Sequence, residues 1–144
     1  MILLTPDLRF ACRANDINRR AAMRDGKPEP DPVTVVKFFN PLGSATWLAT
    51  ELFDDNDSCF GLADLGFGTP ELGLFSLSEL AGVRLPFGLT IERDIAFVTD
   101  HPLSTWATWA RRSGSIASAE SLLRRASQTG RAPKLPASDD IGGG

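Results

Sequence analysis

The chain of 144 residues is poor in metal-binding side chains, with His101 as its single histidine and Cys12 and Cys59 as its two cysteines. A Cys/His zinc site needs about four ligands, which these residues cannot supply within one chain. The two cysteines lie on separate segments without a C-x-x-C pair, so we expect reduced thiols rather than a disulfide. We expect no metal and no other cofactor.

The sequence also lacks the motifs of the common nucleophilic enzymes. No G-x-S-x-G motif is present, and neither cysteine lies in a sequence context that would activate its thiol. Asp100-His101 resembles half of a hydrolase triad, but a triad also needs a nucleophile. We therefore expect His101 to be a surface residue and the protein to have no catalytic residue.

Long apolar runs are absent as well. No segment approaches the roughly 20 apolar residues that cross a bilayer. The N-terminal sequence MILLTPDLRF has no basic region before its short apolar part, unlike a signal peptide. We expect a cytoplasmic protein without membrane contact.

What the sequence does contain is an uneven charge distribution within a net charge of −3. Residues 1–104 have more acidic than basic side chains, whereas residues 105–138 hold six basic side chains against Glu120 alone. The chain thus has an acidic body, residues 1–104, followed by a basic arm, residues 105–138. This charge distribution is informative about binding partners and not about the fold.

Turn residues and apolar patterns divide residues 1–104 into one helix and then strands. Thr5-Pro6-Asp7 is typical of a helix start, and we expect this helix to run to about Met23. Ser76 and Glu79 have the spacing of a capping box before a short helix. β-Branched and aromatic runs predict strands, with a possible bulge at Gly61, over residues 33–39, 45–53, 59–65, 71–75 and 91–98.

The composition changes after Pro102, where two more helices are predicted. Ser104 and Ser118 are the expected caps, and residues 130–144, rich in Pro, Ser and Gly, are expected to be disordered. We divide the chain into a core domain over residues 1–104, a helical basic appendix over 105–129 and a tail over 130–144. The pattern predicts an α+β fold: an antiparallel meander of about five strands with an N-terminal helix and C-terminal helices.

The predicted core takes apolar residues from both faces of this sheet, because helices are expected to cover one face and part of the other. Its members are Val35, Phe38, Trp47, Leu48, Phe60, Leu72, Leu74, Phe75, Leu77, Leu80, Ile91, Ile95 and Phe97.

The segments ELGLFSLSEL, from Glu71 to Leu80, and LTIERD, from Leu89 to Asp94, resemble a bacterial family catalogued as a domain of unknown function. Further similar motifs bring the resemblance to about residues 1–104. Members of that family are commonly encoded on plasmids, integrative elements and phages. The resemblance implies a small cytoplasmic accessory protein of a mobile genetic element and no reaction.

Two acidic groups are candidates for function. Glu51, Asp54, Asp55 and Asp57 lie in or beside one predicted hairpin turn, where they could bind a divalent cation or a basic protein groove. A solvated turn needs Asp and Asn in any case, and this is the favoured interpretation. Glu92 and Asp94 would share one face of a strand and could serve acid–base or metal chemistry. A structural contact between this strand and the Arg84 segment is the favoured alternative.

The basic arm supplies the remaining candidates. Trp106 and Trp109 have helical spacing, which favours packing on the sheet, but tryptophan and arginine are also enriched in binding hot spots. The arginine pairs could contact nucleic-acid phosphates. Partner-binding candidates in this arm are therefore Trp106, Trp109, Arg111, Arg112, Arg124 and Arg125.

Three functions remain open on this evidence. The favoured hypothesis is a non-enzymatic interaction protein of a mobile element that binds and inhibits a host defence complex, of the anti-CRISPR or anti-restriction type. The first alternative is a nucleic-acid-binding accessory protein that uses the basic arm. The second is a carboxylate- or metal-dependent enzyme built on Glu92 and Asp94.

Overall fold

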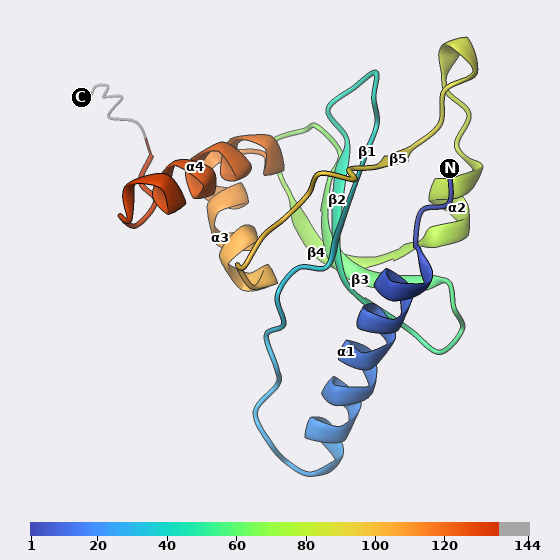
Figure 1. The fold of residues 1–144 in the computed structure, drawn as a ribbon, viewed down its shortest axis with the longest axis vertical. Helices are drawn as coiled ribbons and strands as arrows, with labels where there is room; N and C mark the ends of the chain where they lie inside the picture. Colours follow the sequence, from blue (N-terminus) through green and yellow to red (C-terminus); the bar gives the residue numbers. More distant parts are fainter. Residues whose placement is uncertain (136–144) are drawn as a thin grey trace.

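The computed structural model describes residues 1–135, so most of the tail predicted for residues 130–144 lies outside the described residues. The protein has an α+β fold with an N-terminal helix, a five-stranded antiparallel sheet and C-terminal helices, which confirms the predicted fold class (Figure 1). Its elements are α1 (Pro6–Arg24), β1 (Val36–Phe39), β2 (Thr46–Leu52), β3 (Ser58–Asp64), β4 (Glu71–Ser76), α2 (Leu77–Gly82), the 3₁₀ turn η1 (Pro86–Gly88), β5 (Glu92–Arg93), α3 (Leu103–Ser113) and α4 (Ile116–Thr129).

The strands lie in the order β4-β3-β2-β1-β5. The first four form a meander, because short turns join antiparallel neighbours, and β5 pairs with β1 at the far edge. The strand predicted over residues 91–98 is much shorter than expected. The Asp94 side chain accepts a hydrogen bond from the Ala96 amide at 3.0 Å, and this local turn ends the strand.

Each face of the sheet has its own apolar core. The start of α1, the residues before it and α2 cover one face, where the fully buried Phe38 lies. The helices α3 and α4 cover the other face and bury Leu48 and Leu62 (Figure 1). Trp106 of α3 belongs to this second core, so the C-terminal helices are packed against the sheet.

The predicted core is confirmed at Phe38, Trp47, Leu48, Leu77, Leu80 and Ile91. It is wrong at Leu72, Leu74 and Ile95, whose exposed fractions are 39%, 61% and 79%. Leu72 and Leu74 lie on the edge strand β4, and Ile95 lies in the turn after β5. An apolar strand pattern does not reveal whether the strand is covered on both faces.

The bulge predicted at Gly61 lies on the neighbouring strand instead. The pairing of β2 with β3 shifts between Ala49 and Glu51, so Thr50 is the extra residue. Gly61 has a different role: a Cβ atom there would lie 1.7 Å from the Leu48 carbonyl oxygen. The two backbones approach so closely at this point that only glycine fits.

The caps of the C-terminal helices also differ from the prediction. Ser104 lies inside α3 and its hydroxyl donates to the Asp31 carboxylate. The side chain of Ser115, rather than Ser118, caps α4 and accepts the Ser118 amide at 3.0 Å. Gly114 ends α3 in the left-handed conformation, which leaves Ser115 extended in the position where a cap is needed. The Ser76 cap of α2 is confirmed, with the Glu79 amide at 3.1 Å.

Candidate functional site

A buried carboxylate with three arginines organises the second half of α1. The spacing of three and four residues places Arg13, Arg19 and Arg20 around Asp16, which has no exposed surface. Their nitrogens lie 2.7, 2.9 and 3.1 Å from its oxygens. Burial alone would raise the pKa of the Asp16 carboxyl, but the hydrogen bonds from the arginines outweigh burial and hold the pKa below its ordinary value.

The same helix face is bonded to the bulge in β2. Arg13 Nη1 donates to the Leu52 carbonyl at 2.7 Å, and Asn15 Nδ2 donates to the Thr50 carbonyl at 2.8 Å. Arg19 Nε lies 2.7 Å from Glu51 Oε1, and this hydrogen bond raises the pKa of the Arg19 guanidinium. Glu51 is buried by this contact. The prediction that groups Glu51 with the exposed acidic turn is therefore wrong, because the bulge turns its side chain toward α1.

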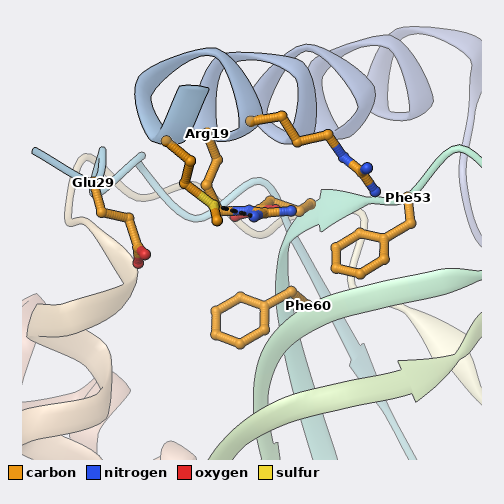
Figure 2. A pocket seen from close by; sticks show the side chains of 7 residues that line it. Arg19, Glu29, Phe53 and Phe60 are labelled. Atoms are coloured by element: carbon orange, nitrogen blue, oxygen red, sulfur yellow. Dashed lines mark hydrogen bonds and ion pairs between the residues drawn. The ribbon is translucent and has the colours of Figure 1, made fainter. Parts of the chain in front are cut away.

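Beside this network lies an open hollow with a volume of about 470 Å³ (Figure 2). It is formed by α1, by the ends of β2 and β3 and by the segment after α1. The guanidinium groups of Arg19 and Arg20 lie 5.4 and 5.5 Å from the centre of the Phe53 ring. Figure 2 shows Phe60 below α1 and Glu29 across the hollow from Phe53. The lining residues are Arg19, Arg20, Met23, Glu29, Glu51, Phe53 and Phe60.

Arg20 is the group in this hollow that is best placed to meet another molecule. Its side chain is 50% exposed, and Nε holds Asp16. Among the described residues, Nη1 and Nη2 have no hydrogen-bond acceptor, so both remain able to bind a carboxylate or a carbonyl. This site was not predicted from the sequence. The signal was present as Arg13, Asp16, Arg19 and Arg20 at helical spacing within the predicted first helix.

The acidic turn between β2 and β3 is a structural element. Asp55 accepts hydrogen bonds from the Ser58 hydroxyl at 2.6 Å, the Ser58 amide at 2.8 Å and the Asp57 amide at 2.9 Å, which lower its pKa to about 2. Asp57 accepts the Ser76 hydroxyl at 2.7 Å and the Ser78 amide at 2.8 Å, which lower its pKa and join the turn to α2. Asp54 remains exposed. Over residues 1–135, no group of three or more His, Cys, Asp or Glu side chains is arranged to hold a metal ion.

The two carboxylate candidates at β5, Glu92 and Asp94, take part in different contacts. Asp94 Oδ2 lies 3.3 Å from Lys37 Nζ, which also lies 2.8 Å from Glu120 Oε1 on α4. Arg93 Nη1 donates to the Ile2 and Leu3 carbonyls at 2.6 and 3.1 Å. The contact of this segment is thus with β1, α4 and the N-terminus rather than with the Arg84 segment. Glu92 pairs with Phe39 across the sheet.

His101 lies half-buried beside Trp106 rather than fully on the surface. It lines a small cavity of about 180 Å³, and its Nε2 atom is buried without a hydrogen-bond partner in the described part of the chain. The Asp100 carboxylate lies 3.6 Å from this nitrogen but is itself exposed. The neighbouring Thr99 hydroxyl accepts the Trp106 indole N–H at 3.2 Å, which fixes the tryptophan.

The partner-binding candidates in the basic arm differ in how far they are exposed. Trp106 is buried, with the centre of the Phe97 ring 5.8 Å from that of its own ring, so the favoured interpretation of packing on the sheet is confirmed and the alternative of a partner surface at Trp106 is wrong. Trp109 is half-buried under the Arg112 guanidinium, which lies 5.0 Å from its ring centre. Arg124 lies 3.8 Å from Glu120, and Arg111 is exposed. Two adjoining hollows on α4 bring together Arg112, Arg125, Arg131 and Lys134.

Comparison with known protein families gives one match. The model of the family described as "Protein of unknown function (DUF2958)" matches residues 3–117. The chain belongs to this family. The DUF2958 match includes α3 and the start of α4, so it extends beyond residue 104, the end of the resemblance expected from the sequence motifs.

No curated protein and no solved structure matches the chain significantly. None of the described helices is both long enough and apolar enough to cross a membrane.

Proposed function

We propose that this DUF2958 member is a non-enzymatic interaction protein, and that its partner is a protein that docks at the hollow beside α1. The observation that carries the proposal is the half-exposed side chain of Arg20, whose guanidinium Asp16 holds near the Phe53 ring in the lining of the hollow. Arginine and aromatic side chains in partly enclosed sites provide much of the energy of protein interfaces.

The network around Asp16 prepares this surface for binding. Arg19 and Arg20 are held by hydrogen bonds before a partner arrives, so docking costs less side-chain entropy than it would for free arginines. Phe60 and Met23 supply apolar surface beside the charged groups. The complementary partner presents a carboxylate toward Arg20 and an apolar side chain toward Phe60.

The identity of the partner is proposed from the resemblance to proteins of mobile elements. The partner in this proposal is a host defence complex, of the restriction or CRISPR type, that the protein binds and inhibits. The excess of acidic side chains over residues 1–104 supports this choice through contacts outside the hollow, because such complexes present basic grooves for nucleic acid.

Affinity capture from bacterial lysate tests the proposal with a matched pair of variants. Arg20→Gln removes the exposed guanidinium of the hollow, and Arg24→Gln removes an exposed arginine one turn further along α1, outside the hollow. We expect the wild type and Arg24→Gln to retain a stoichiometric protein partner and Arg20→Gln to lose it while remaining folded, because Arg13 and Arg19 still hold Asp16. Recovery of no stoichiometric partner, or equal recovery by both variants, would contradict the proposal.

A second candidate function is supported by the basic group on α4. Arg112, Arg125, Arg131 and Lys134 line adjoining hollows, and within residues 1–135 the lining contains no carboxylate. Four such contacts to duplex phosphates would give a slope of about −3.6 for log affinity against log salt concentration. Mobility-shift titration at low salt tests this function. Arg125→Glu should abolish a shift that Arg124→Gln retains, because Arg124 lies beside Glu120.

A further inference from the structure

The outer edge of β4 is an open strand with exposed leucines. In the described chain β4 pairs with β3 alone, and it forms the end of the sheet. Its residues Glu71–Ser76 contain no lysine, proline or bulge, the features that usually protect such an edge from pairing.

The hydrogen-bond pattern shows which backbone groups are free. The Leu77 amide donates to the Asp57 carbonyl at 2.9 Å, in register with the β3–β4 ladder. Because hydrogen-bonded pairs alternate along an antiparallel ladder, Gly73 and its second neighbours direct their backbone groups toward β3. Leu72 and Leu74 therefore direct their N–H and C=O groups outward.

The side chains of the same two leucines lie on one face of the sheet. Leu72 pairs with Leu62 and Leu74 pairs with Phe60, so both lie on the face that α3 and α4 cover further along the sheet. The two helices stop short of β4, and Leu72 and Leu74 are exposed together with Leu65 and Phe67 of the preceding turn. The outward backbone groups and the exposed apolar side chains thus coincide at Leu72 and Leu74.

We propose that a second copy of this chain pairs with β4, antiparallel and about a two-fold axis at Gly73. Only outward-facing residues can form the new hydrogen bonds, and this register pairs Leu72 of each copy with Leu74 of the other. Four leucines then pack together on one face. The single charge of the strand, Glu71, lies opposite Phe75 of the other copy, so like charges do not meet.

The shape of the strand suits this register. The two Gly73 residues meet as a non-hydrogen-bonded pair, in which the Cα atoms are about 4.5 Å apart. A shift by two residues would place Leu72 opposite Ser76, whose hydroxyl is already bonded to Asp57 at the start of α2. Stable dimers use about 20 residues a side or more, and β4 with its turn supplies fewer. The expected dimer is therefore dependent on concentration.

Sedimentation equilibrium from low micromolar to millimolar protein tests the association. Leu74→Pro removes an N–H that faces outward and leaves the ladder with β3 intact, and Leu42→Lys is the control at an exposed leucine in another turn. We expect the wild type and Leu42→Lys to dimerise with increasing concentration. Each Leu74→Pro copy loses one of the new hydrogen bonds, so the dissociation constant should rise by about tenfold or more. A wild type that stays monomeric, or a dimer that Leu74→Pro leaves unchanged, overturns the proposal.

Crosslinking tests the register even if Leu74→Pro fails to fold. A Cβ atom at Gly73 meets no other atom within 4 Å, so Gly73→Cys is tolerated, and the spacing of the Gly73 pair suits a disulfide. Under mild oxidation Gly73→Cys should form a covalent dimer. Glu71→Cys should not, because residue 71 lies opposite Phe75 of the other copy, four positions along the strand from that copy's residue 71. Equal crosslinking of the two variants, or none in either, contradicts the two-fold register.

Discussion

Asp16 shows how strongly one residue can determine the structure around it. The carboxylate is fully buried and neutralises a cluster of three arginines. In Asp16→Asn, Arg13 and Arg20 would lose this counterion while Arg19 would keep Glu51, and breaking a buried ion pair typically costs about 3–5 kcal/mol. We expect a loss of that size in the free energy of unfolding, measured in urea. Asp25→Asn, whose exposed carboxylate forms an ion pair with Arg24, should cost less than about 0.5 kcal/mol.

The pH dependence of stability follows from the same residue. The pKa of Asp16 is lower in the folded protein than its ordinary value of 3.8. The stabilisation of the folded state by the ionised Asp16 carboxylate is therefore complete above that ordinary value, and it is lost as the pH falls through the folded pKa. We expect the melting temperature of the wild type to fall below about pH 4 and Asp16→Asn to show a smaller fall. An identical fall in both proteins would mean that other carboxylates control acid unfolding.

The burial of the two cysteines predicts that their thiols react slowly in the native protein. Burial raises the pKa of Cys12 and of Cys59 to about 12, so at pH 8 only about one thiol in ten thousand is ionised. A thiol reagent such as Ellman's should leave the native protein unmodified and react with both cysteines in denaturant. Rapid reaction of the native protein would show that the core opens easily around these residues.

Among the elements, the sheet was the most predictable part. Alternating β-branched and aromatic residues place β2, β3 and β4 to within about a residue, whereas β1 begins at Val36 rather than at the predicted Val33, and Ser76 predicts the cap of α2. The weaker result at β5 has a physical cause. Asp94 begins a local turn that competes with the strand, and the apolar pattern of residues 95–98 does not reveal it.

The candidate site was less predictable than the fold. Glu51 and Asp55 look equivalent in the sequence, but the bulge at Thr50 turns Glu51 toward α1 and leaves Asp55 in the solvated turn. Bulges depend on the pairing of two strands, and neither strand alone contains that information. The hollow beside α1 depends on the same pairing.

Gly61 allows a test of how tightly β2 and β3 approach. In Gly61→Ala the new methyl group would meet the Leu48 carbonyl, and both groups belong to the backbone of the sheet. We expect a loss of about 3 kcal/mol or more in the free energy of unfolding. Gly73→Ala is the matched control, because Gly73 pairs with Gly61 and has open space for a Cβ atom. Its cost should stay below about 1 kcal/mol, and equal costs for both variants would refute the close approach.

For the whole molecule, the packing of α3 against the sheet predicts the sites of limited proteolysis. Trypsin should cut first after Arg131 and Lys134, which follow the end of α4 at Thr129. Arg111 and Arg112 are exposed, but they belong to a helix that is anchored by Trp106 and Ala110. Local unfolding would be needed for cleavage there. Mass spectrometry of an early digest decides the order, and early fragments ending at Arg111 would show that α3 is loosely held.

Truncation of the chain before Thr105 tests how much the C-terminal helices stabilise the sheet. The remaining chain would expose the apolar sheet surface around Leu48 and Leu62 to solvent. We expect lower stability or aggregation of this fragment, measured by its melting temperature and light scattering. A fragment that melts like the full chain would mean that the C-terminal helices contribute little to the fold.

The contact between Arg93 and the carbonyls of Ile2 and Leu3 has a consequence for the rate of folding. It joins Arg93 to residues that lie 91 and 90 positions earlier in the chain, and Lys37 and Glu120 are joined across 83 positions. The hairpins of the meander close short loops, whereas these two contacts must wait until long loops have closed. Chains dominated by distant contacts fold on the scale of milliseconds to seconds. The meander is therefore expected to form first, and docking of the N-terminus on β5 should be among the last events before the native state is reached.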